Sequence, residues 1–105
     1  MNGIYTVKQV NSYIKNMFTQ DFMLNRIYVK GEISNCKYHP SGHIYFSLKD
    51  ESGTIACVMF AGSRAGLSFT LKNGQRVIAF GSVSVYERDG KYQLYAREIK
   101  LDGAG

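Results

Sequence analysis

The chain has 105 residues, of which 45% are hydrophobic and 20% charged, which is the composition of a folded protein and not of a disordered one. This length allows one domain with a modest core, and no internal repeat or proline-rich linker divides it. Thirteen Lys and Arg against eight Asp and Glu give a formal net charge of +5, which favours polyanionic partners. Because no apolar run reaches membrane-spanning length and no secretory signal is present, we expect a cytoplasmic protein without membrane contact.

The first predicted element is an amphipathic helix from about Val7 to Phe18. Thr6 and Gln9 have the spacing of a capping box, which marks a helix start. We expect the apolar stripe of this helix to pack against the rest of the domain, although a stripe of this kind can also fit the groove of a partner. Residues 1–22 are therefore predicted to be a helix on the barrel that residues 23–105 form. The stripe consists of Val7, Val10, Ile14, Met17 and Phe18.

From Arg26 the apolar residues recur with period two, which predicts strands. In the first strand Ile27, Val29 and Ile33 share one face, and Gly31 predicts a bulge or a sharp coil. The later predicted strands are His43–Lys49, Thr54–Phe60, Arg76–Tyr86 and Tyr92–Lys100.

Turn residues separate these strands. His39–Gly42 and Asp50–Gly53 predict tight turns, and the Asp-Gly pair within Glu87–Lys91 is a strong hairpin signal. The segment 61–75 is irregular, with one short helical turn expected around 63–65. A meander, an irregular connection and a final hairpin predict an all-β fold with one N-terminal helix, namely a five-stranded Greek-key barrel of the OB type. An SH3-like barrel is the competing architecture.

The second strand carries the candidate binding chemistry. If its apolar residues point into the barrel, Tyr45 and Lys49 lie together on the outer face as a base-stacking platform beside a phosphate contact. Alternatively, Tyr45 is an ordinary cross-strand aromatic and Lys49 a solubilising charge. The flanking loops favour the binding interpretation, because the first is expected to supply Lys37, Tyr38 and His39 and the last Arg88, Lys91 and Tyr92. The complete predicted nucleic-acid site is Lys37, Tyr38, His39, His43, Tyr45, Ser47, Lys49, Phe60, Arg64, Arg88, Lys91 and Tyr92.

The third strand is predicted to alternate between core and cleft. Its inward residues would be Ile55, Cys57 and Met59, and its cleft residues Ala56, Val58 and Phe60. Phe60 is either a second stacking residue or a core residue, because one slip in register exchanges the two faces. Cys36 and Cys57 form no CxxC pair, so we expect two free thiols and no disulfide or zinc site.

Catalysis by this chain alone is disfavoured. The sequence has no HExxH motif, no phosphate loop and no paired carboxylates on one face. Asp50 and Glu51 follow the second strand at the end opposite His43, about 20 Å away at roughly 3.3 Å per residue. We therefore predict no catalytic residue, no metal ligand and no cofactor here.

Six runs of residues, of which GEISN and SGHIYFSLKD are the most specific, extend over nearly the whole chain. They are Tyr5–Val7, Val29–Asn35, Ser41–Asp50, Cys57–Phe60, Val83–Glu87 and Tyr92–Leu94. In order and spacing these runs resemble the N-terminal domain of the large subunit of bacterial exodeoxyribonuclease VII.

The resemblance implies an OB domain that binds single-stranded DNA and precedes a catalytic domain and a helical region that assembles with small subunits. It also implies that the complete enzyme degrades single-stranded DNA from both ends to acid-soluble oligonucleotides. Leu101–Gly105 resembles the junction that follows the OB domain in this family, so the chain is expected to be a fragment. The family's catalytic residues have no matching positions here.

Two other functions remain open. Anticodon-binding OB domains of class II aminoacyl-tRNA synthetases use an outward aromatic of the second strand and nearby basic residues, which Tyr45 and Lys49 resemble. A protein-interaction OB module is the third possibility, and its binding would be insensitive to salt.

Overall fold

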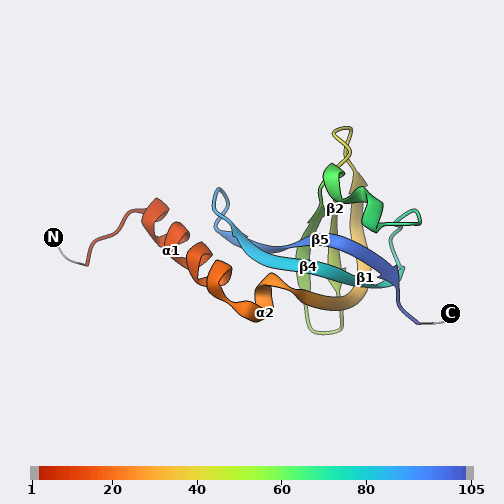
Figure 1. Cartoon of the computed structure of the whole chain (residues 1–105), viewed down its shortest axis with the longest axis horizontal. Helices are drawn as coiled ribbons and strands as arrows, with labels where there is room; N and C mark the ends of the chain where they lie inside the picture. Colours follow the sequence, from red (N-terminus) through yellow and green to blue (C-terminus); the bar gives the residue numbers. More distant parts are fainter. Residues whose placement is uncertain (1–2, 104–105) are drawn as a thin grey trace.

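The structure of the chain is a computed structural model that describes residues 3–103. A helical arm precedes a small barrel and lies at one end of it, beside the hairpin between the last two strands (Figure 1). Residues 1–2 and 104–105 lie outside this range. It therefore excludes the outer ends of the predicted segments 1–22 and 23–105, and part of the predicted junction Leu101–Gly105. The elements are α1 (Val7–Gln20), α2 (Phe22–Asn25), β1 (Ile27–Tyr38), β2 (Ile44–Lys49), β3 (Thr54–Met59), the 3-10 helix η1 (Ala61–Gly66), β4 (Arg76–Tyr86) and β5 (Lys91–Leu101).

The five strands close into a barrel in the order β1-β2-β3-β5-β4. Strand β1 has two neighbours, because it pairs with β4 from Ile27 to Glu32 and with β2 from Glu32 to Tyr38. Gly31 lies where it changes partner, and a side-chain carbon there would lie 3.1 Å from the carbonyl oxygen of Lys49. The parallel pairing of β3 with β5 closes the barrel. The predicted OB architecture is therefore confirmed, whereas the bulge of β1 lies between Ser34 and Lys37 and not at Gly31.

The core fills the barrel with one face of each strand. Ile44, Phe46 and Leu48 are buried, as the period-two pattern of β2 predicted. Each such side chain stabilises the fold by about 1.5–3 kcal/mol through burial. The other members of this core include Ile33, Cys57, Met59, Leu71, Val77, Ala79, Val83, Leu94, Ala96 and Ile99.

Strand β1 is longer than predicted. Lys37 and Tyr38 were expected in a loop, but they pair with β2 after a bulge between Ser34 and Lys37. Asn35 has φ of 49°, and the backbone N–H of Cys36 donates to the side chain of Asn73 at 2.9 Å instead of to a strand. Asn35 and Cys36 are therefore part of a β-bulge, and β1 continues to pair with β2 after it.

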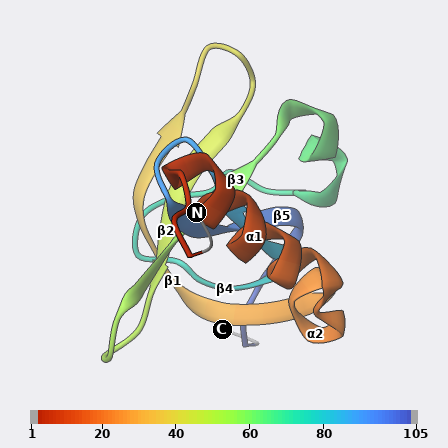
Figure 2. The same cartoon turned by 90° about the vertical axis from the view of Figure 1, so that its left-hand side faces the viewer.

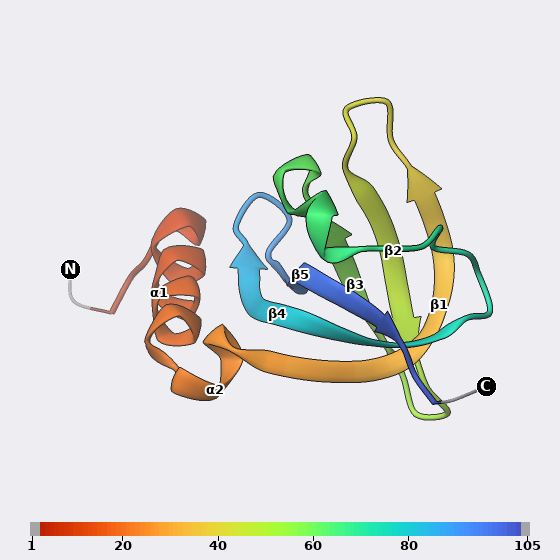
Figure 3. The ribbon, with the colours of Figure 1, turned by 45° about the vertical axis from the view of Figure 1, so that its right-hand side comes forward.

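The predicted turns are confirmed. Gly42 donates to the carbonyl of His39 at 2.9 Å, and Asp50 donates to the carbonyl of Gly53 at 3.0 Å. Gly90 closes the last hairpin with φ of +64°, which only glycine adopts readily. The β1–β2 loop lies beside η1, whereas the β2–β3 turn lies at the opposite end of the barrel (Figure 3).

Helix α1 begins at the predicted capping box, but the expected packing of its apolar stripe is confirmed only for Phe18, which packs against the core. The other four stripe residues are exposed, with Val7 at 77%. Most of the contacts of the helix with the β4–β5 hairpin are polar, because that hairpin presents Glu87 and its backbone. Ser12 donates to the Glu87 carboxylate at 2.9 Å, and Lys15 forms an ion pair with it at 3.4 Å. Figure 2, which places α1 in front of the barrel, shows the helix as a separate arm.

The same contacts lower the pKa of Glu87. The hydrogen bond from Ser12 is the largest cause, followed by the hydrogen bond and the positive charge of Lys15. Within residues 3–103, no helix has both the length and the apolar character needed to cross a bilayer.

Candidate nucleic-acid interface

On the outer face of β2 and β3, side chains form rows, because backbone pairing places them opposite one another. Residues that pair across a ladder lie on the same face, and successive rows are about 7 Å apart. The predicted outward set of β2 is confirmed as an outer face, with Tyr45 exposed, Ser47 half-buried and Lys49 exposed. The rows are Lys37–Tyr45–Val58–Tyr95, Ser34–Ser47–Ala56, and Arg76–Glu32–Lys49–Thr54.

Aromatic rings form a continuous cluster at the first row. The Tyr45 ring lies 6.1 Å from His39 and 6.4 Å from His43, both in edge-on geometry. The His43 ring lies 5.1 Å from Phe60, which in turn lies 5.6 Å from Tyr95. Tyr45 and Phe60 are 44% and 45% exposed, so their ring faces are accessible. We call these five rings, His39, His43, Tyr45, Phe60 and Tyr95, the aromatic cluster.

Two residues of β3 and β5 differ from expectation. Val58 has the predicted outward direction but is only 1% exposed, because it pairs with Tyr45 on one side and Tyr95 on the other. It is also absent from the main core, so it packs beneath the rings and does not line the cleft. Tyr95 was missed by the sequence analysis, because only the parallel pairing of β3 with β5 brings it beside this face.

The β1–β2 loop is held in place by η1. His43 Nδ1 accepts a hydrogen bond from the backbone N–H of Ala61 at 2.8 Å, and Arg64 donates to the carbonyl of Gly42 at 3.0 Å. The Arg64 guanidinium also lies 5.4 Å from the centre of the Tyr38 ring. The loop that carries His39 and His43 is therefore fixed before any ligand arrives.

Tyr38 lies on the other side of the β1–β2 ladder from Lys37. It pairs with the inward-facing Ile44, whereas Lys37 pairs with the outward-facing Tyr45. Its hydroxyl accepts a hydrogen bond from the backbone N–H of Leu71 at 2.7 Å. These contacts place Tyr38 among the residues that brace the loop, apart from the aromatic cluster.

The final hairpin lies at the other end of the same face. Lys91 and Tyr92 line a shallow hollow of about 330 Å³ together with Thr54, Ile55 and Ala56 of β3. The ring of Tyr92 lies 6.3 Å from Phe18 of α1, and Arg88 is exposed in the turn. The β2–β3 face is thus bordered by the β1–β2 loop at one end and by the β4–β5 hairpin at the other.

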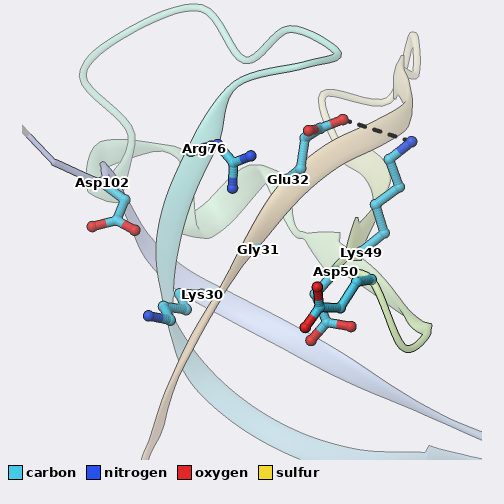
Figure 4. Close-up of a pocket in the computed structure, with 8 residues that line it drawn as sticks. Lys30, Gly31, Glu32, Lys49, Asp50, Arg76 and Asp102 are labelled. Atoms are coloured by element: carbon cyan, nitrogen blue, oxygen red, sulfur yellow. Dashed lines mark ion pairs between the residues drawn. The ribbon is translucent and has the colours of Figure 1, made fainter. Parts of the chain in front are cut away.

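A second hollow, of about 610 Å³, does not suit phosphate. Lys30, Lys49 and Arg76 line it, but so do four carboxylates, which would repel an anion (Figure 4). Glu32 also forms an ion pair with Lys49 at 3.6 Å, so part of the Lys49 charge is already neutralised. Lys37 forms no ion pair within residues 3–103. The remaining carboxylates of the hollow are Asp50, Glu51 and Asp102.

Groups suited to metal or thiol chemistry are sparse on this face. Within the described part of the chain, no cluster of three or more His, Cys, Asp or Glu residues is arranged to hold a metal ion. Both cysteines are free, as predicted. Burial raises the pKa of Cys57 to about 12, and it raises the pKa of the half-buried Cys36 as well.

This fold and this face define the class of protein. Residues 5–100 match the family model of the OB-fold nucleic acid binding domain, and the chain belongs to that family. The predicted OB-fold class is confirmed by this match.

The chain is also similar in sequence to named proteins. The chain is 71% identical over 105 residues to the exodeoxyribonuclease 7 large subunit of Lachnoclostridium phytofermentans and 57% identical over 100 residues to that of Clostridium botulinum strain Okra. It covers 26% and 25% of these two proteins, so it spans about a quarter of their length. The predicted resemblance to the large subunit of exodeoxyribonuclease VII is thereby confirmed.

Among solved structures, asparaginyl-tRNA synthetase from Pyrococcus horikoshii is similar to the chain with a TM-score of 0.59. The match covers 78% of this chain and 21% of the synthetase at 16% identity. At that identity the likeness concerns the fold alone.

Proposed function

We propose that this chain binds single-stranded DNA through the outer face of β2 and β3, without strong sequence preference. The observation that carries the proposal is the aromatic cluster, in which Tyr45 and Phe60 are exposed. Tyr45 pairs across the ladder with Lys37, a cation with no carboxylate partner among residues 3–103. Stacking on aromatic rings tolerates every base, and a lysine contacts the backbone irrespective of sequence.

The predicted site residues have different roles in this proposal. Tyr45 and Phe60 stack bases, His39 and His43 border the platform, and Lys37 contacts phosphate. Tyr38 and Arg64 hold the β1–β2 loop. The site further includes Ser47 and Lys49 on β2 and Arg88, Lys91 and Tyr92 on the final hairpin.

The proposal extends to the longer protein. We propose that the chain is one unit of a cytoplasmic exonuclease that degrades single-stranded DNA and assembles with small subunits through regions beyond these residues. In this unit, residues 1–22 accompany the OB domain of residues 23–105. High identity to exodeoxyribonuclease 7 large subunits supports this assignment. Catalysis is assigned to the longer protein, and the 105-residue chain is expected to leave labelled single strands intact with or without magnesium.

Fluorescence anisotropy tests the binding directly. The 105-residue chain is titrated against a labelled single strand, the matching duplex and an RNA strand of the same sequence, each at several salt concentrations. We expect the single-stranded DNA to bind more tightly than the duplex, with affinity that falls as salt rises. Equal binding to single strand and duplex would refute the proposal. Preference for RNA would favour an anticodon-type domain, and binding of neither nucleic acid would favour a protein-interaction module.

A further inference from the structure

A second aromatic and basic surface lies on the outer face of β1, β4 and β5, apart from the aromatic cluster. Tyr28 of β1 pairs with Phe80 of β4, and their ring centres are 4.7 Å apart. The guanidinium of Arg26 lies 5.5 Å from the centre of the Phe80 ring, and that of Arg97 lies 5.4 Å from it. We call Arg26, Tyr28, Phe80 and Arg97 the arginine–tyrosine patch.

Local backbone geometry builds this patch. The β4–β5 register shifts between Phe80 and Gly81, so that Arg97 is an extra residue in β5. Gly81 allows the shift, because any side-chain carbon there would overlap the carbonyl oxygen of Tyr95. The bulge leaves Arg97 and Glu98 both exposed between the buried Ala96 and Ile99. Arg97 then donates to the carbonyl of Asn25 at 3.1 Å, which holds its guanidinium beside Phe80.

Positive charge continues along the same face. Lys30 and Lys100 lie one row further on, where both pair with Ile78, and both are exposed. The two rows are Tyr28–Phe80–Glu98 and Lys30–Ile78–Lys100, and Glu98 is their single acidic residue. The ion pairs within residues 3–103 are Lys15–Glu87 and Lys49–Glu32, so none of the patch's basic residues has a carboxylate partner there.

Fold stability does not account for this arrangement. An exposed contact between a guanidinium and an aromatic ring contributes only about 0.5–1 kcal/mol, and two cations beside one ring repel each other. Tyr28 is 72% exposed, so the outer face of its ring contacts water. Two fixed cations beside an open aromatic ring are the groups that hold a phosphate and its base.

We propose that the arginine–tyrosine patch binds a second segment of single-stranded DNA, with Tyr28 stacking a base and Arg26 and Arg97 contacting its phosphates. This inference rests on the proposed function of the β2–β3 face. The carboxylate-lined hollow of Figure 4 lies between the two surfaces, with Lys30 and Arg76 on its β1–β4 side and Lys49 on its β2 side. Because this hollow separates them, a short strand occupies one surface at a time and favours the β2–β3 face with its larger aromatic cluster, whereas a long strand reaches both surfaces and gains affinity from the second contact.

The test compares oligonucleotides of about 8 and about 30 nucleotides, since one OB domain contacts about 4–16. With the long strand, Arg26→Gln/Arg97→Gln should lower the slope of log K against log salt by about 1.4, which is two phosphates at about 0.7 each. With the short strand the slope should not change. Tyr28→Ala should weaken the long strand by about fivefold or more, which is the lower limit for one stacked base.

Two controls separate charge from folding. Arg26→Lys/Arg97→Lys keeps both charges and should keep the long-strand slope, and Lys8→Gln/Lys72→Gln removes the same charge from elsewhere on the surface and should leave it unchanged. Tyr28→Ala leaves the Arg97 hydrogen bond to Asn25 intact, and thermal unfolding of each variant verifies its fold.

The outcomes distinguish the two proposals. If the short strand binds through Tyr45 and the patch variants change neither slope nor affinity for the long strand, the second surface is refuted and the proposed function stands. If the short strand does not bind, or binds equally well to Tyr45→Ala, the β2–β3 assignment fails. A long-strand slope that still depends on Arg26 and Arg97 in that case supports the patch as the binding surface.

Discussion

Replacing Tyr45 by alanine separates base stacking from charge on the β2–β3 face. Tyr45 is 44% exposed beside the rings of His39 and His43, so almost half of its surface remains available to a base. Loss of one base–aromatic stack costs about 1–3 kcal/mol, which corresponds to about a 5- to 140-fold weaker affinity for single-stranded DNA. Because stacking releases no counterions, the slope of log K against log salt should not change.

Lys37→Gln provides the contrasting perturbation. Lys37 pairs with Tyr45 across the ladder and has no carboxylate partner among residues 3–103, so it is free to neutralise one phosphate. Its loss should lower the salt slope by about 0.7. Tyr13→Ala removes an exposed tyrosine from α1 and should leave both quantities unchanged.

Anisotropy titrations at four or more salt concentrations measure both quantities for every variant. Thermal unfolding is needed beside them, because Tyr45 covers the buried Val58 and its removal will also reduce stability. If Tyr45→Ala unfolds at a lower temperature but binds DNA as tightly as the parent chain, Tyr45 is a structural cross-strand residue and the stacking argument is wrong. A slope that falls with Tyr45→Ala would also contradict it.

Three further predictions follow from single contacts. Glu32→Gln should release Lys49 from its ion pair and tighten DNA binding by up to about fivefold, since an exposed pair contributes about 0–1 kcal/mol; weaker binding in titrations would contradict this. The folded-state pKa of Glu87 is lowered, so its contact with α1 should be intact above pH 4.5 and lost as pH falls through that lowered pKa. Amide exchange of α1 measures this loss. Glu87→Gln should remove the pH dependence. Cys57, with a pKa of about 12, should react with a thiol reagent at pH 8 only after unfolding, whereas the half-buried Cys36 reacts first; equal rates would show that the barrel opens.

Local pattern was sufficient to predict α1, the order of the five strands and the faces of β2. The alternation of Ile44, Phe46 and Leu48 places Tyr45 outward, because successive side chains of a strand point to opposite faces. The capping box and the Asp-Gly turn likewise act through neighbouring residues only, and both were predicted correctly. The same local order carried the resemblance to the exodeoxyribonuclease VII large subunit.

What covers each face depended on tertiary structure. Alternation placed Val58 outward, but the parallel pairing of β3 with β5 brings Tyr95 beside it, and the rings of both neighbouring strands bury it. The stripe of α1 has helical periodicity, yet only Phe18 packs against the core, because the hairpin beside the rest of the helix is polar. Arg97 faces Phe80 only because a bulge shifts the β4–β5 register. The sequence by itself thus determined which way the side chains of a regular strand such as β2 point, and long-range strand pairing decided which side chains meet, because residues far apart in the chain become neighbours only when the barrel closes.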